Sequence, residues 1–283
     1  MIKLISLLSL LLLIVGCSNR TEFDFESSQA DTNQSSVTLT QSSDISYNNY
    51  AQVLSQYVNK QGKVNYQSLQ QNRQPLDSFN QSVASLSPQV YQSWTENEQI
   101  AFWINIYNSL TLEAIIDNYP VDSIKDIPGV WKRLQFTVMG EELTLDQIEH
   151  EILRKDFDEP RLHMGIVCAS IGCPILRQEP FIGDKLDQQL DEQTLAFLAL
   201  ERNFQINKEE NKVYLSSIFK WFGEDFESKF AVENQFAGQG KERAVLNFIG
   251  QYLENQNQTY LKQGDYQISY LNYDWSLNDL KAN

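Results

Sequence analysis

Residues 95–118, TENEQIAFWINIYNSLTLEAIIDN, decide the fold, because they predict one long central helix. Thr95 and Glu98 form a capping box, a pattern that opens helices. Pro120 disfavours helical backbone at the residue before it, so the helix should end at about Asn118. Apolar residues occupy nearly every side of this segment, which is typical of a helix packed on all sides. The remaining segments must therefore fold around it.

Two amide side chains, Asn105 and Asn108, interrupt the apolar surface of this helix. At the helical repeat they lie close together on one side. A buried amide has to be hydrogen-bonded, so the two asparagines either fix neighbouring backbone or support a functional site. Both alternatives stay open from the sequence, and we favour the first.

Shorter helices and strands are expected on both sides of the central helix. The helical patterns cover 50–58, 145–155, 184–200 and 241–253, and the strand-like patterns cover 62–66, 134–138, 143–144, 164–168, 213–215 and 266–270. No linker and no internal repeat interrupts them after about residue 45. The sequence therefore predicts a single domain over 45–283 of the α+β (or α/β) class, mainly helical with a small mixed sheet.

Length and charge narrow the class of protein. With 283 residues and 42% hydrophobic positions, the chain can build a large core. It holds 22 Lys+Arg against 37 Asp+Glu, a net charge of −15, and shows no basic patch, so we expect no nucleic-acid partner. It contains no glycine-rich phosphate loop, and no cofactor is expected. Three cysteines are too few for a disulfide scaffold.

The first 16 residues predict a secretory signal peptide. Lys3 precedes an apolar run, Leu4–Val15, that is too short for a permanent membrane span. The run ends in Gly16-Cys17, which resembles the lipobox of bacterial lipoproteins and implies cleavage before Cys17 and lipidation of its thiol. The alternative is an ordinary signal peptide with a chance cysteine.

The residues after the signal predict a tethered domain. Ser18, rather than an aspartate, follows the lipidated position, which favours the outer membrane. Residues 17–44 then combine the lipidated cysteine with a polar stretch that is typical of a flexible tether. We therefore expect an outer-membrane-anchored lipoprotein whose domain, residues 45–283, lies in the periplasm.

The segment 158–174 carries the residues best suited to catalysis, His163, Cys168 and Cys173. Pro174 suits the first position of a helical turn. A thiol at a helix start has its thiolate stabilised by the helix dipole, so the pKa of Cys173 should lie below the ordinary value of about 8.5. His163, at the start of the strand expected before this loop, is the base expected to pair with it.

An acidic partner for the histidine is expected on the helix that precedes this segment. Glu149 falls inside the apolar arc of that helix, whereas His150 falls outside it. Because an unpaired buried carboxylate is costly, Glu149 should be mostly buried and should orient His163, as the third member of a catalytic triad does. The alternative is that Glu149 only pairs with Arg154, with Arg161 or with a helix end.

Three other interpretations of the cysteines stay open. Cys168 and Cys173 can form a disulfide in an oxidising compartment. The two thiols with His150 and His163 can ligate zinc, but the gap between the histidines matches no recognised finger, so no metal is expected. Cys168 can also be a small core residue of the expected strand.

Several blocks of the sequence together are specific enough to indicate a family. They are Phe102–Asn108, Leu145–Arg154, Pro160–His163, Cys168–Pro174, Ile218–Phe226 and Tyr273–Asn278, and they resemble domain-of-unknown-function family 547. The resemblance covers most of 45–283 and implies a secreted bacterial protein or lipoprotein. It also implies a papain-like thiol hydrolase with a Cys–His–acid arrangement. Here the acid and the histidine precede the cysteine, so a papain-like layout would have a permuted order.

Two hypotheses of different classes follow. The first is a cysteine hydrolase that acts on peptide or amide bonds of envelope material, with Cys173 as nucleophile, His163 as general base and Glu149 as orienting acid. Its supporting residues would be Asn105, Asn108, His150 and Arg161. The second is a non-catalytic envelope module that binds a peptide or a partner protein.

Overall fold

The expected central helix is present as α5 (Glu96–Asn118) in the computed structural model, which describes residues 40–41 and 45–280. The capping box is formed: the side chain of Thr95 accepts a hydrogen bond from the backbone of Glu98, and the Glu98 carboxylate accepts one from the backbone of Thr95. Every residue over 100–112 is buried. The predicted signal peptide, the lipidated Cys17 and most of the tether lie outside the described residues.

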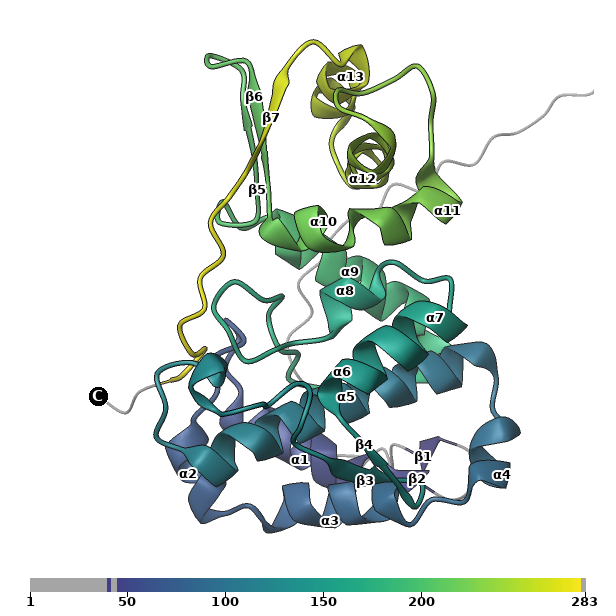
Figure 1. Cartoon of the computed structure of the whole chain (residues 1–283), viewed down its shortest axis with the longest axis vertical. Helices are drawn as coiled ribbons and strands as arrows, with labels where there is room; N and C mark the ends of the chain where they lie inside the picture. Colours follow the sequence, from purple (N-terminus) through teal and green to yellow (C-terminus); the bar gives the residue numbers. More distant parts are fainter. Residues whose placement is uncertain (1–39, 42–44, 281–283) are drawn as a thin grey trace, which may run out of the picture. The chain divides into compact units, whose positions relative to one another are not determined.

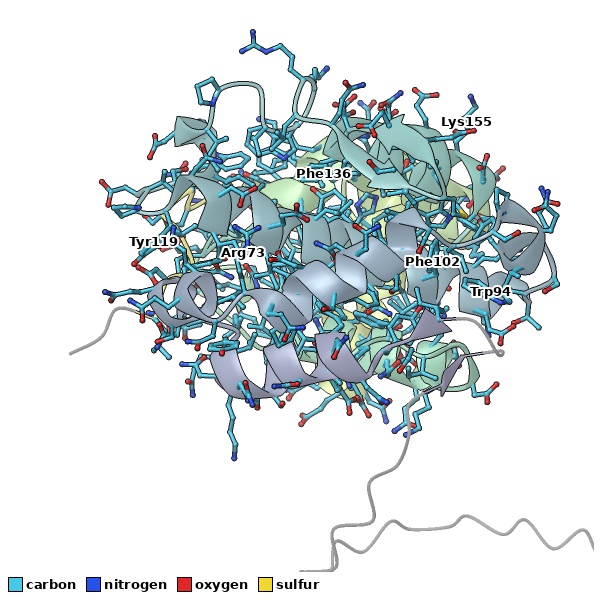
Figure 2. The ribbon with its side chains drawn as sticks, turned by 90° about the horizontal axis from the view of Figure 1, so that it is seen from below. Arg73, Trp94, Phe102, Tyr119, Phe136 and Lys155 are labelled. Carbon is cyan, nitrogen blue, oxygen red and sulfur yellow. The ribbon has the colours of Figure 1, made fainter. Side chains whose placement is uncertain are left out.

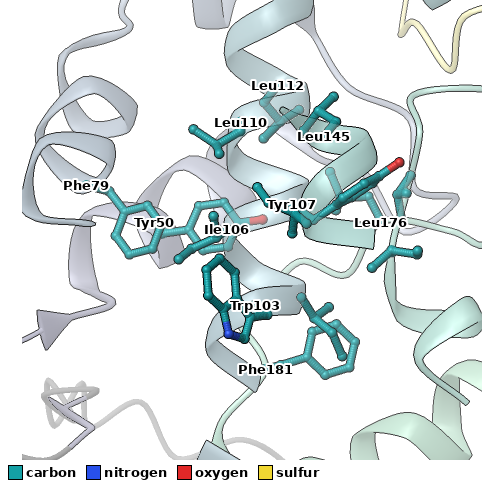
Figure 3. Close-up of a cluster of buried hydrophobic side chains, with 14 of the residues drawn as sticks. Tyr50, Phe79, Trp103, Ile106, Tyr107, Leu110, Leu112, Leu145, Leu176 and Phe181 are labelled. Atoms are coloured by element: carbon teal, nitrogen blue, oxygen red, sulfur yellow. The ribbon is translucent and has the colours of Figure 1, made fainter. Parts of the chain in front are cut away.

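The first hydrophobic core surrounds α5. Its elements are β2 (Ile45–Ser46), α1 (Asn48–Tyr57), α2 (Tyr66–Gln71), α3 (Gln74–Ala84), α4 (Pro88–Gln92), η1 (Ile124–Asp126), β3 (Phe136–Val138) and β4 (Glu141–Leu143), and β1 (Thr40–Gln41) pairs antiparallel with β2 (Figure 1). Tyr50 and Phe79 pack on one side of α5, and Leu176 and Phe181 pack on the other (Figure 3). At the beginning of the helix, Trp94 packs edge-on against Phe102 with ring centroids 5.1 Å apart (Figure 2).

A second hydrophobic core lies around a three-stranded sheet. Its elements are α9 (Leu186–Leu198), β5 (Phe204–Asn207), β6 (Lys212–Leu215), α10 (Ser217–Phe222), η4 (Gly223–Phe226), α11 (Glu227–Phe230), α12 (Gly240–Gly250), α13 (Asn255–Gln263) and β7 (Gln267–Tyr270). Strand β6 pairs antiparallel with β5 and parallel with β7, and the helices between β6 and β7 supply the crossover that a parallel pair requires. The predicted α+β class, mainly helical with a small mixed sheet, is confirmed.

The helix expected over 145–155 is interrupted by a π-helical turn. It consists of α6 (Leu145–Gln147), the π-helix η2 (Ile148–Leu153) and α7 (Arg154–Asp156). A π-helix closes its hydrogen bonds over five residues and is frequent at functional sites. The side chains after Gln147 therefore do not follow the regular helical spacing assumed from the sequence.

The strand expected over 164–168 is absent. Residues Leu162–Gly165 form the short helix α8, and no regular element follows until η3 (Gly183–Lys185). The reason is the side chain of Asn108, which donates to the carbonyl of Gly165 (2.9 Å) and accepts from the N–H of Val167 (2.8 Å). These backbone groups are thus satisfied by an amide side chain rather than by a neighbouring strand.

Asn105 acts on the chain in the same way as Asn108. Its amide donates to the carbonyl of Phe181 (2.8 Å) and accepts from the N–H of the same residue (2.9 Å). The interpretation that both asparagines fix neighbouring backbone is therefore confirmed. Together they fasten the irregular segment 166–182 to α5 at two points.

The C-terminal segment 271–280 runs from β7 back to the first core (Figure 1). Asn278 holds it there: its N–H donates to the carbonyl of Ala169 (3.0 Å), and its side-chain oxygen accepts from the hydroxyl of Tyr66 (2.7 Å). This path brings Tyr273 and Trp275 beside the segment that contains the cysteines. In the described part of the chain, no helix is both long enough and apolar enough to cross a membrane.

The buried amide of Asn108 should be one of the most sensitive positions of the fold. Asn108→Ala leaves a buried N–H and a buried carbonyl without partners, so it should lower the free energy of unfolding by about 2–4 kcal/mol. The matched control is Asn118→Ala on the exposed end of the same helix, which should change it by about 0.5 kcal/mol or less. Urea denaturation checks both values, and equal effects would contradict the role of Asn108.

Candidate active site

A cavity of about 280 Å³ gathers the side chains on which catalysis was predicted to depend. Cys168, Cys173, His150 and His163 all line it. Its other walls are mainly aromatic and are formed by Tyr107, Trp131, Trp221, Phe222, Tyr273 and Trp275, with Lys132, Asp146 and Glu149 among the polar groups. Residues from α5, η2, α8, α10 and the C-terminal segment therefore meet at one place.

The two cysteines form a hydrogen-bonded pair of free thiols, not a disulfide. The hydroxyl oxygen of Tyr273 lies 3.1 Å from Sγ of Cys168 and 3.0 Å from Sγ of Cys173. The backbone N–H of Cys168 also donates to Sγ of Cys173 at 3.0 Å. Cys173 is buried, whereas Cys168 is half-buried. Cys168 is thus the more exposed residue of the pair.

The pKa predicted for Cys173 from the sequence is wrong in direction. Burial raises the pKa of its thiol well above the ordinary value. No helix begins at Pro174, so no helix dipole favours the thiolate. For Cys168 the hydrogen bond with the Cys173 thiol lowers the pKa, against the opposing effect of burial, and the hydroxyl of Tyr273 lowers it further. Cys168 is therefore the thiol that ionises more readily.

His163 lies in α8 and is paired with Asp225, a residue that the sequence did not single out. Its Nε2 is 2.7 Å from Oδ2 of Asp225, and its ring stacks on Phe222 with centroids 4.3 Å apart. Arg154 donates two hydrogen bonds to the same carboxylate, of 2.6 and 2.8 Å. Burial raises the pKa of Asp225, but the hydrogen bonds from Arg154 and His163 outweigh it and hold that pKa well below the usual range.

Glu149 lines the cavity but is bonded to a different residue from the one expected. It is half-buried on η2, and its Oε2 accepts a hydrogen bond from the hydroxyl of Tyr107 (3.0 Å). Burial and the nearby Glu149 carboxylate raise the pKa of Tyr107 well above its ordinary value, so this hydroxyl stays protonated. The structure thus corrects the expected hydrogen bond of Glu149 with His163, whereas a partly buried position is what it shows for Glu149. The cause is the π-helical turn, which changes the angle between successive side chains.

His150 and Arg161 support the site in different ways. His150 lies on the cavity wall, with its Nδ1 2.9 Å from a guanidinium nitrogen of Arg154. Arg161 lies outside that wall and forms ion pairs with Glu159, Asp187 and Asp191. Because Asp187 and Asp191 belong to α9, these ion pairs fasten the beginning of α8, and with it His163, to a neighbouring helix.

Nothing in the described residues resembles a metal centre. No group of three or more His, Cys, Asp or Glu side chains in that part of the chain is arranged to hold an ion. The zinc interpretation of the two histidines and two cysteines therefore finds no support in the geometry.

The functional residues that the sequence analysis missed are Asp225 and Tyr273. Both lie inside blocks that carried the family resemblance, 218–226 and 273–278. Those blocks were the available signal. Asp225 follows His163 by 62 residues, and Tyr273 follows Cys168 by 105 residues. No local sequence pattern predicts contacts over such separations.

The comparisons with known proteins concern the central part of the chain. The family described as "Protein of unknown function, DUF547" has a model that matches residues 91–198. Residues 91–198 are therefore the part of the chain that is similar to DUF547, and this part is called the DUF547 segment. No curated protein and no solved structure matches the chain.

The DUF547 segment contains only part of the cavity. It includes Glu149, His163, Cys168 and Cys173, whereas Asp225 and Tyr273 follow it in the chain. The description of DUF547 names no activity, so the chemistry has to be inferred from the cavity itself. The papain-like layout stays a prediction.

The accessibility and pKa of the two thiols predict which of them reacts first. At neutral pH, iodoacetamide should alkylate Cys168 faster than Cys173, because the thiolate is the reactive form. Tyr273→Phe removes a hydroxyl that lowers the pKa of Cys168 and should slow this alkylation. Tyr270→Phe, on β7 and bonded to Glu242, is the matched control and should not change it. Peptide mapping after timed labelling checks the order, and earlier labelling of Cys173 would contradict it.

The pairing of Asp225 predicts a pH-dependent contribution to stability. Its folded-state pKa is lowered, so the ionised carboxylate stabilises the fold above the unfolded-state pKa of about 4, and this contribution is lost as the pH falls below it. Asp225→Asn should therefore destabilise the protein at pH 7. The difference in the free energy of unfolding between wild type and this variant should shrink by up to about 1.4 kcal/mol per pH unit below pH 4.

Urea unfolding at several pH values measures this gap. Asp187→Asn removes a carboxylate from an exposed position and should have little effect at any pH, because exposed ion pairs contribute little. A gap for Asp225→Asn that stays constant between pH 7 and pH 3 would contradict the ion-pair assignment.

Proposed function

We propose that this domain is a cysteine hydrolase that cleaves amide or ester bonds through a thioester intermediate. One observation carries the proposal: a half-buried thiol of lowered pKa and a histidine held by an ionised aspartate line the same cavity. A thiolate nucleophile, a base and a residue that orients the base are the components of nucleophilic acyl transfer.

Cys168 is the attacking thiol in this proposal, in place of Cys173. The residue is the more exposed of the two and its thiol ionises more readily. Cys173 keeps its proton because burial raises its pKa, and it can donate a hydrogen bond to the Cys168 thiolate. The hydroxyl of Tyr273, 3.1 Å from Sγ of Cys168, is a second donor to the same anion.

His163 is the general base, and Asp225 takes the orienting role predicted for Glu149. The bond of its Nε2 to Asp225 leaves Nδ1 as the nitrogen that accepts a proton. In the described residues no hydrogen bond joins His163 to either thiol, so the proton moves through one water or after a small shift on substrate binding. Stacking on Phe222 holds the ring in place during this transfer.

The reaction has two steps. The Cys168 thiolate attacks the substrate carbonyl carbon, and the C–N or C–O bond breaks as His163 gives its proton to the leaving group. Water then attacks the thioester while His163 accepts one of its protons, which releases the acid and restores the thiol. Under this proposal the enzyme is an outer-membrane lipoprotein held by lipid on Cys17, and its substrate is peptide or amide material of the periplasm.

A non-catalytic module that binds a peptide or partner protein is the second candidate. The observation in its favour is the aromatic wall of the cavity, where three of the chain's five tryptophans, Trp131, Trp221 and Trp275, are found. Aromatic side chains of this kind are enriched where proteins recognise partners. A binding module needs neither the thiol pair nor the His163–Asp225 pair, so catalysis separates the two candidates.

The test uses small activated esters, such as p-nitrophenyl acetate, as probes of acyl transfer by the reduced full-length protein. Cys168→Ser and His163→Ala should each lower kcat/KM by about 100-fold or more. Cys173→Ser should lower it by about tenfold at most, because it removes only a hydrogen-bond donor. His150→Ala removes the other histidine of the cavity, which acts only through Arg154, and should lower kcat/KM by about tenfold at most.

Other outcomes would decide against parts of the proposal. If Cys173→Ser abolishes turnover and Cys168→Ser does not, the nucleophile is Cys173, as the sequence suggested. If no variant differs from wild type, the esters are not cleaved at this cavity, and the binding module is the better account.

A further inference from the structure

The thiol pair has a second chemistry besides acyl transfer. Both sulfurs lie within about 3.1 Å of one oxygen, the Tyr273 hydroxyl, so they are at most about 6 Å apart. The hydrogen bond from the N–H of Cys168 to Sγ of Cys173 brings the backbone of one cysteine equally close to the sulfur of the other. Two free thiols at this separation are within reach of a disulfide after side-chain rotation.

The two cysteines differ in the way that a reactive and a resolving cysteine differ. Cys168 is half-buried on the cavity wall, where a small oxidant can reach it. Cys173 also lines the cavity but is only 3% exposed, and its sulfur accepts a hydrogen bond from the backbone of Cys168. Oxidation-sensitive cysteines are accessible and lie beside a second cysteine that captures the oxidised product.

The backbone that links the two cysteines can accommodate the bond. Residues 169–172 belong to no helix or strand, and the turn closes with the N–H of Cys173 donating to the carbonyl of Ser170 (3.1 Å). Backbone hydrogen bonds also join Ala169, Ile171 and Gly172 to the C-terminal segment, so the disulfide has to form by rotation of the two cysteine side chains. The Tyr273 hydroxyl contacts both sulfurs and so holds them near each other.

We propose that Cys168 is oxidised by hydroperoxides and that Cys173 converts the product into a reversible Cys168–Cys173 disulfide. In the first step the Cys168 sulfur attacks one peroxide oxygen and the O–O bond breaks, giving a sulfenic acid and, from hydrogen peroxide, water (an organic hydroperoxide releases its alcohol instead). In the second step the Cys173 sulfur attacks the sulfenic sulfur, the S–O bond breaks, and a second water leaves. Sulfur loses two electrons in total and the peroxide gains them.

The functional consequence rests on the proposed hydrolase. A disulfide removes the Cys168 thiolate, so the oxidised protein should be inactive and a dithiol reductant should restore it. The second cysteine also stops oxidation at a reversible stage, because a sulfenic acid that forms a disulfide does not proceed to the irreversible sulfinic acid. The site would be switched off by peroxide rather than destroyed by it.

One tryptic peptide reports the whole reaction. Trypsin should release residues 162–177, which contain both cysteines and no internal Lys or Arg. The reduced full-length protein is treated with a small excess of hydrogen peroxide, alkylated with iodoacetamide and digested with trypsin. The mass of the peptide is then measured by mass spectrometry. The peptide should lose two hydrogen atoms, about 2 Da, and should take up no alkyl group until dithiothreitol is added. Met164 on the same peptide is an internal control, because its oxidation adds an oxygen instead.

Two variants separate the roles of the cysteines. In Cys173→Ser, a sulfenic acid on Cys168 should accumulate and be trapped by dimedone, and more peroxide should drive it to the sulfinic acid. In Cys168→Ser, Cys173 should stay reduced at the same peroxide dose. If wild-type Cys168 stays fully alkylatable, or goes directly to the sulfinic acid, the inference is overturned by the wild-type protein alone.

This test fails independently of the hydrolase test. The peptide mass needs no substrate, so it gives the same answer whether or not the reduced protein cleaves esters. Conversely, ester cleavage is measured on the reduced protein and does not depend on the disulfide. A disulfide that forms while reduced wild type lacks turnover would support this inference and contradict the proposed function.

Discussion

The hydrogen bonds of one buried side chain, Asn108, determine the local structure of this protein more than any other contact. A helix that is apolar on all sides cannot leave an amide unsatisfied, so Asn108 has to find partners outside α5. It finds them in the carbonyl of Gly165 and the N–H of Val167. His163 precedes these two residues and Cys168 follows them, so the position of both is set by a bond to the core.

The hydrogen bonds of the Asp225 carboxylate connect the two hydrophobic cores. Asp225, on η4 in the second core, accepts hydrogen bonds from Arg154 on α7 and is bonded to His163 on α8. The aspartate thus joins three elements through one carboxylate, and its lowered pKa reflects that arrangement. The orientation of the histidine therefore depends on how the two cores pack.

The sequence was sufficient for features that local patterns encode. The capping box of Thr95 and Glu98 and the unbroken apolar surface specify α5, because both act within a few residues of the chain. The hairpin of β3 and β4 and the amphipathic α9 follow from similar local signals. The segment 158–174 was also recognised as the place of the chemistry, since it concentrates the cysteines and a histidine.

The predictions for His163, Glu149 and Cys173 differ from the structure for identifiable physical reasons. The partner of His163 is 62 residues away, and no periodic pattern encodes a contact over that distance. For Glu149, the prediction assumed the angle between successive side chains of a regular α-helix, and this angle does not hold in the π-helical turn. The hydrophobic pattern does not predict such a turn. For Cys173, Pro174 suits a helix start, but the backbone that follows is held by Asn105 at Phe181, and burial then governs the pKa.

The late position of Tyr273 in the chain has a consequence for biosynthesis. Tyr273 is 105 residues beyond Cys168, so at about 5–20 residues per second the ribosome needs roughly 5–20 s to produce it after the first thiol. During that interval the Cys168–Cys173 pair lacks the hydroxyl that contacts both sulfurs in the folded domain. The nascent chain therefore passes through a period in which both thiols are present but a contact that lowers the pKa of Cys168 is not, so Cys168 becomes fully reactive only after the C-terminal segment has folded back onto it.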